Sequence, residues 1–181
     1  MRYYLVEQDK AFTDSPYLKN WFNEIDVNSI KKGLYWKIPS RTFLDVYPNE
    51  HIQFTDIILS PFPLISKTVK ETIELFEKEI IYKEVVLRDS KYNNLSTYYL
   101  PFLDRLNCSH EDSEFNTDRS KIHKLILDTS KIINRPIFIL DDMEKYFLIV
   151  KIDLLEAILR RGATGIHVSS IENKKGDELD G

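Results

Sequence analysis

The chain has 181 residues and a formal net charge of −4; 43% of the residues are hydrophobic and 30% are charged. This length fits one domain of ordinary size, and the composition excludes a disordered chain. Lysine and arginine are scattered among the acidic residues, which argues against a nucleic acid as the partner. The single cysteine, Cys108, excludes an intramolecular disulfide framework and fits a reducing compartment.

The N-terminus gives no targeting signal. Its first six residues are apolar enough for a strand, but Glu7, Asp9 and Lys10 interrupt the run before a signal-peptide core could form. No stretch approaches the roughly 18 apolar residues of a membrane-spanning helix. We therefore expect a cytoplasmic protein with no membrane partner.

Patterns in the first third of the chain are short. Residues 3–6 predict a strand, residues 28–33 a loop, and residues 34–38 a strand that ends at Pro39. Between them a short amphipathic helix is predicted from apolar residues at helical spacing, namely Leu18, Trp21, Phe22 and Ile25.

The middle of the chain is more regular. Ser66 has the hydroxyl of an N-cap residue and predicts a helix over residues 66–79, with apolar residues along one face. Strands are predicted over residues 82–87 and 97–100. A polar, acidic and aperiodic stretch over residues 104–120 predicts an exposed loop.

The last third alternates apolar runs with turns. A strand is predicted over residues 122–127, and a hairpin joins 136–140 to 146–150 through an acidic turn. A helix over residues 151–161 ends at Gly162, which suits a C′ position at positive φ. A last strand covers 165–168, and residues 172–181 form a polar tail.

These elements predict an α+β fold. We expect a single domain over residues 1–171, with one mixed, mostly antiparallel sheet and two main helices, 66–79 and 151–161. Ten tyrosines and ten phenylalanines also favour substantial β-structure.

No motif for catalysis, metal binding or cofactor binding is found. The histidines lie far apart and match no zinc-ligand spacing, and the glycines form no phosphate-binding loop. Cys108 and His110 are near neighbours in a loop, which rarely aligns a nucleophilic pair. We therefore expect no enzyme, no cofactor and no metal. One enzymatic alternative is a hydrolase that uses dispersed carboxylates, Asp56 with Asp104 or Asp128.

The order and spacing of the apolar segments resemble a known family. The resemblance covers about residues 56–171 and starts with Asp56-Ile57-Ile58-Leu59, Phe62-Pro63-Leu64-Ile65-Ser66 and Tyr98-Tyr99-Leu100-Pro101. It continues through Pro136-Ile137-Phe138-Ile139-Leu140, Tyr146-Phe147-Leu148-Ile149-Val150, Leu154-Leu155-Glu156-Ala157-Ile158 and Thr164-Gly165-Ile166-His167-Val168. The chain is similar to the eleventh numbered family of polymorphic-toxin immunity proteins, formerly a domain of unknown function.

The resemblance implies a small bacterial cytosolic protein that binds and neutralises a cognate toxin domain. Acidic groups near an aromatic residue suit docking onto a basic toxin cleft. The partner-binding residues that we predict are Glu111, Asp112, Glu114 and Phe115 in the central loop, and Asp141, Asp142 and Glu144 in the hairpin turn.

Two other interpretations stay open. These acidic residues could be ordinary solvated turns, or the chain could be a general protein-interaction module with an acidic docking loop. The sequence also leaves the oligomeric state open, since the aromatic-rich N-terminal segment could present an apolar patch for a dimer.

Overall fold

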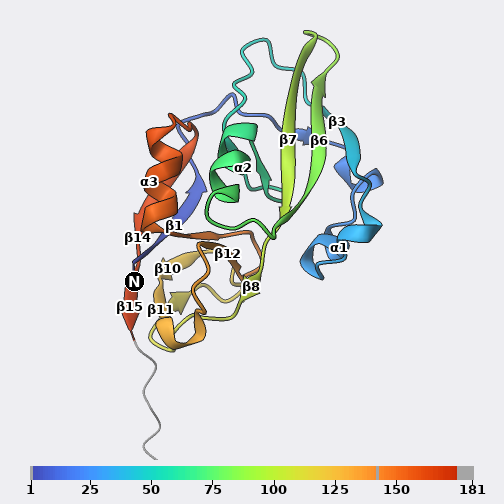
Figure 1. The fold of residues 1–181 in the computed structure, drawn as a ribbon. Coiled ribbons are helices and arrows are strands. Elements are labelled where there is room, and N and C mark those ends of the chain that lie inside the picture. Colours follow the sequence, from blue (N-terminus) through green and yellow to red (C-terminus); the bar gives the residue numbers. More distant parts are fainter. Residues whose placement is uncertain (1, 142, 175–181) are drawn as a thin grey trace, which may run out of the picture.

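The structure, a computed structural model, describes residues 2–141 and 143–174 (Figure 1). The helices are α1 (Val27–Lys31), α2 (Lys67–Glu74), α3 (Ile152–Arg160) and the 3-10 helices η1 (Trp21–Asn23), η2 (Tyr35–Lys37) and η3 (Thr129–Lys131). The strands are β1 (Tyr3–Gln8), β2 (Leu18–Lys19), β3 (Arg41–Val46), β4 (Ile57–Ile58), β5 (Leu64–Ile65), β6 (Ile81–Asp89), β7 (Asn94–Phe102), β8 (Arg105–Leu106), β9 (Glu114–Phe115), β10 (Ile122–Lys124), β11 (Ile126–Asp128), β12 (Ile137–Leu140), β13 (Leu148–Lys151), β14 (Ile166–Ser170) and β15 (Glu172–Lys174). The fold class is α+β, as the sequence predicts.

The described strands form two large sheets rather than the one that was expected. The first has six strands in the order β2-β3-β6-β7-β5-β4, with β3 and β6 parallel. The second has five strands in the order β14-β1-β13-β12-β8, and only the β12–β8 pair is parallel. Two further small sheets pair β10 with β9 and β11 with β15. Pairing is therefore mixed and mostly antiparallel.

Helical segments cover both faces of the six-stranded sheet. The Tyr35 ring of η2 contacts Phe102 and lies under the Lys83 ammonium, whereas Lys70 of α2 lies over the rings of Tyr82 and Tyr99. Because successive side chains of a strand point to opposite faces, η2 and α2 lie on opposite sides of this sheet. The long β6–β7 hairpin extends beyond both (Figure 1).

The five-stranded sheet is also covered on both faces. One face contributes Val6, Leu148 and Val150 to a core that α3 and the six-stranded sheet share. The other face contributes Leu5, Phe138 and Ile149 to a second core. Residues from the chain between β8 and β12 close that second core, namely Cys108, Leu125, Leu127 and Ile132. Within the predicted exposed loop, residues 104–120, Cys108 is fully buried and Leu106 and Phe115 pack against this core, so the prediction is wrong for these three residues.

The two main helices are close to the predicted ones. Ser66 is the N-cap of α2, and its hydroxyl accepts a hydrogen bond from the Val69 amide at 3.3 Å. The helix ends at Glu74, earlier than predicted, since Leu75 and Phe76 are exposed and no longer face the core. Gly162 follows α3 with φ of 77°, as a C′ glycine should.

The predictions for residues 18–38 are wrong. The segment predicted to be a helix forms β2 followed by η1. Leu18 and Ile25 are buried but Phe22 is 65% exposed, so the helical spacing of these residues does not define one buried face. The predicted loop contains α1, which begins where the Asp26 carboxylate accepts hydrogen bonds from two backbone amides. The predicted strand over residues 34–38 is η2.

Part of the predicted polar tail is ordered as a strand. Residues 172–174 of the predicted polar tail form β15, which pairs with β11 in parallel, and residues 175–181 lie outside the described residues.

In the part of the chain that the structure describes, no helix has the length and apolar character needed to cross a membrane.

Candidate functional site

The central loop is held against β11 by backbone hydrogen bonds. The Asp128 amide donates to the Cys108 carbonyl, and the His110 amide donates to the Ile126 carbonyl, both at 2.8 Å. The Ser113 hydroxyl donates to the Ile126 carbonyl and accepts from the Ile126 amide, each at 3.0 Å. These bonds fix the backbone of residues 108–113 while leaving the side chain of Glu111 in solvent.

The second half of the loop pairs with the strand that follows it. β9 runs antiparallel to β10, with Phe115 opposite Ile122. Glu114 is exposed, whereas Phe115 is half-buried and packs against the second core. The Arg119 guanidinium lies 4.9 Å from the centre of the Phe115 ring, which is a cation–π distance. Phe115 therefore supports Arg119 and is less available to a partner than the sequence suggested.

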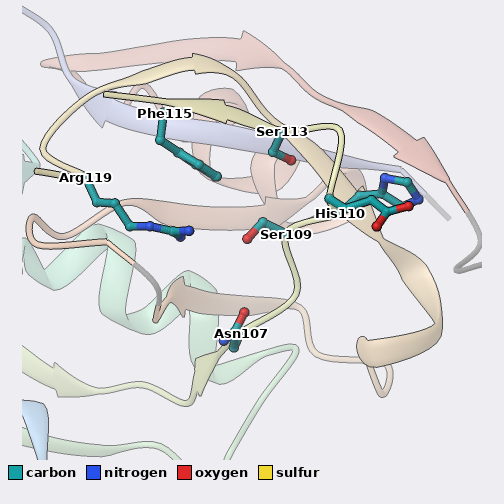
Figure 2. Close-up of a pocket in the computed structure, with 7 residues that line it drawn as sticks. Asn107, Ser109, His110, Ser113, Phe115 and Arg119 are labelled. Carbon is teal, nitrogen blue, oxygen red and sulfur yellow. The ribbon is translucent and has the colours of Figure 1, made fainter. Parts of the chain in front are cut away.

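A pocket of about 390 Å³ opens in this loop, lined by Asn107, Ser109, His110, Glu111, Ser113, Phe115 and Arg119. Figure 2 shows the side chains of Arg119 and Ser109 pointing toward one another, with the His110 ring turned away from them. A guanidinium beside hydroxyl and amide groups suits a carboxylate or another polar acceptor from a partner.

The hairpin turn lies beside the central loop, although the two are about thirty residues apart in sequence. The Glu144 amide donates to the Arg119 carbonyl at 3.2 Å. Asp141 is paired with Arg105, whose Nε lies 2.6 Å from its Oδ1. Asp142 lies outside the described residues. The structure therefore brings the two predicted segments together on one surface, which we call the loop–hairpin surface (residues 107–119, 141 and 143–145).

The predicted acidic residues of this surface divide into two groups. Asp112 is ion-paired with Lys174, and the hydrogen bond from that ammonium is the main cause that holds the pKa of Asp112 below its usual range. Asp141 is paired as described above. By contrast, Glu111, Glu114 and Glu144 are exposed, and no ion pair within residues 2–141 and 143–174 involves them. These three carboxylates are the ones free to meet a partner's cations.

A larger hollow of about 1080 Å³ adjoins the same surface. Ser120, Lys121, Glu144 and Lys145 line it, together with the end of β1 and Asp9, Lys10, Phe12 and Ser15. Lys121, Lys145 and Glu144 line the same hollow, so this part of the surface carries both signs of charge. The loop–hairpin surface therefore borders two hollows rather than standing on a flat face.

The carboxylates of the hydrolase alternative are held by separate partners. Asp56 accepts a hydrogen bond from the Ser66 hydroxyl at 2.5 Å and one from the Thr164 amide at 2.7 Å. Asp104 pairs with Arg135 at 2.8 Å, and Asp128 is the N-cap of η3. None of the three lines either hollow. Among the described residues, no group of three or more His, Cys, Asp or Glu side chains is placed to hold a metal ion.

Sequence reasoning missed the polar residues that line the pocket. Asn107, Ser109 and Arg119 lie in an aperiodic stretch, and only the fold of that stretch onto β11 turns them toward one space. Arg119 has φ of 52°, a left-handed backbone conformation that its sequence does not announce.

No protein-family model matches this chain, and no curated protein matches it. The likeness to immunity proteins therefore rests on the order and spacing of the apolar segments described above.

Proposed function

We propose that this protein is an immunity protein that neutralises a cognate bacterial toxin by stoichiometric binding. The segment order that resembles the immunity family motivates the proposal. The central loop and the hairpin turn were each predicted as binding segments because they are acidic. The observation that supports the proposal best is that these two segments meet on one surface beside two hollows. Concave surfaces with charged rims suit protein recognition.

The three carboxylates without an ion pair give this surface its electrostatic role. Glu111, Glu114 and Glu144 are exposed at its rim, where charge mainly steers the encounter and sets its rate. Arg119, which lies over the Phe115 ring, lines the pocket and adds a cation to the same surface. Inhibition by occupation of the toxin's own cleft needs no reaction centre and no cofactor on this chain.

The test is the association of purified protein with the toxin domain encoded beside it. The triple variant Glu111→Lys, Glu114→Lys and Glu144→Lys should bind at least about tenfold more slowly, with a weaker salt dependence. The matched control is Glu24→Lys, Glu50→Lys and Glu79→Lys, which changes three exposed acids elsewhere by the same total charge. The control should bind as the unaltered protein does. Equal slowing in both triples would remove the loop–hairpin surface from the proposal, and no binding by the unaltered protein would end it.

A further inference from the structure

The outer part of the six-stranded sheet carries an ordered set of side chains on one face, most of them exposed to solvent. Leu44 and Val46 of β3 point into the core, so Arg41, Phe43 and Asp45 point to the other face. The parallel register places Glu84, Val86 and Arg88 of β6 beside them, row by row. We call these six residues the β3–β6 face.

The charges of the β3–β6 face alternate in sign. The Arg41 Nε lies 2.6 Å from Glu84 Oε1, and the Arg88 Nε lies 2.8 Å from Asp45 Oδ1. β3 therefore carries a cation and then an anion, while β6 carries an anion and then a cation. Phe43 and Val86 lie between the two ion pairs; Phe43 is 52% exposed, whereas Val86 is only 6% exposed, so the Phe43 ring forms the accessible part of this apolar centre. The result is a checkerboard of four charges around an apolar centre.

Further exposed apolar residues surround this face. Tyr47 follows β3 and is 51% exposed, and its ring packs against that of Tyr17 at 5.5 Å. Leu95 of β7 lies opposite Arg88 of β6 and is 62% exposed. Aromatic and arginine side chains supply most of the energy in protein interfaces, and large exposed apolar residues gathered on one face indicate an interaction site.

We propose that the β3–β6 face binds the same face of a second copy of this chain, about a two-fold axis that runs along the strands between β3 and β6. This rotation places β3 of one copy over β6 of the other. Arg41 then lies over the partner copy's Glu84 position, Asp45 over its Arg88 position, and Phe43 over its Val86 position. Two sheets pack face to face about 10 Å apart, a distance that these side chains span.

The charge pattern is what selects a second copy as the occupant. A two-fold interface brings a surface against itself, so every cation on it must meet an anion of the same surface. The checkerboard meets this condition for all four charges, whereas a surface evolved for an acidic or a basic partner would carry one dominant sign. Lys70 of α2 lies over the rings of Tyr82 and Tyr99, at the far end of this sheet face, whereas Arg41, Phe43, Asp45 and Arg88 are exposed.

This inference is independent of the proposed function. In Figure 1, β3 lies on the opposite side of the molecule from β10 and β11, next to which the loop–hairpin surface is formed. A dimer through the β3–β6 face would therefore leave both loop–hairpin surfaces accessible.

The experiment measures the mass of the protein in solution by sedimentation or light scattering, with two single variants and their mixture. In a dimer of the Arg41→Glu variant, the glutamate at position 41 of each copy faces Glu84 of the other copy. In a dimer of the Glu84→Arg variant, the arginine at position 84 of each copy faces Arg41 of the other copy. Each variant alone should dimerise at least about tenfold more weakly, since like charges across an interface disfavour association. An equimolar mixture should restore the dimer, because each unlike pair is then re-formed. Restoration also requires that both variants are folded.

A second pair of variants tests the apolar centre. Phe43→Asp should give a monomer, whereas Ile133→Asp, at a residue 83% exposed on another part of the chain, should leave the dimer intact. A monomeric unaltered protein at micromolar concentrations would overturn the proposal. So would a dimer that survives both charge variants, or single variants that are monomeric and stay so when mixed.

Discussion

At Gly165 the loop after α3 passes so close to Thr55 that a side chain has no room. A Cβ atom added there would lie 2.4 Å from the Thr55 Cβ, and φ is 74°. We expect Gly165→Ala to lower the free energy of unfolding by about 2–4 kcal/mol, from steric overlap and left-handed backbone strain together. Urea denaturation measures the change.

Gly33 provides the control for this prediction. It has φ of 68°, but an added Cβ would meet nothing within 4 Å. Gly33→Ala should therefore cost only the backbone penalty, about 1 kcal/mol. Equal losses in the two variants would show that Thr55 does not restrict the loop.

Asp89, at the end of β6, predicts a pH dependence of stability. Burial alone would raise the pKa of Asp89, but hydrogen bonds from the backbone amides of Asn49, Tyr92 and Lys91 outweigh it and lower the pKa. A carboxylate whose pKa is depressed on folding stabilises the fold above its unfolded pKa, about 3.9, and loses this contribution as the pH falls through the folded value.

The variant Asp89→Asn isolates this contribution. Its amide nitrogen cannot accept the hydrogen bonds that both carboxylate oxygens accept in the folded protein. The unaltered protein should be the more stable one at about pH 6, and the difference in unfolding free energy should shrink as the pH drops below about 3.9. A difference that is constant across this range would contradict the assignment.

Single residues were predictable where local chemistry decides the structure. Ser66 as an N-cap and Gly162 as a C′ residue follow from hydrogen bonding and backbone sterics, and both are found. Phe115 was not predictable in the same way. Its half-buried position under Arg119 depends on the packing of residues 107–119 onto β11, which no local pattern encodes.

At the scale of elements, Asp56 links the start of α2 to the loop after α3. Its Oδ1 accepts from the Ser66 hydroxyl, and its Oδ2 accepts from the amide and the hydroxyl of Thr164. We expect Asp56→Ala to lower the unfolding free energy by about 2 kcal/mol and Ser66→Ala by about 1 kcal/mol. The double variant should lose less than the sum, because the two changes remove one shared hydrogen bond. Strictly additive losses in a double-mutant cycle would show that this bond contributes nothing.

Elements were predictable where one face is buried along the whole segment. α3 and the β12–β13 hairpin match their predicted positions because Leu154, Leu155 and Ile158 of α3 and the apolar residues of β12 and β13 are buried in the two cores. Residues 18–38 gave no such signal, since buried Leu18 and exposed Phe22 share a helical spacing. Asp26 was the available clue to α1, because its side chain caps the first free amides of that helix.

At the scale of the whole molecule, the division into two sheets could not be predicted from the sequence. β1 pairs with β13 and β14, more than 140 residues away in the chain, and β3 pairs with β6 in parallel. Periodicity identifies a strand but not its partner. For the same reason the candidate site could be predicted only in part. Acidic composition indicated its two segments, but not that the Glu144 amide would donate a hydrogen bond to the Arg119 carbonyl and so bring them together.

We propose that this protein protects a cell from a toxin encoded beside it. The most direct measurement is survival of cells that express the neighbouring gene, with and without this chain. We predict that the neighbour alone is toxic and that co-expression restores growth. We further predict that protection is weakened by the triple Glu111→Lys, Glu114→Lys and Glu144→Lys but kept by the triple at Glu24, Glu50 and Glu79. A toxic neighbour that kills equally well in the presence of this protein would contradict the account.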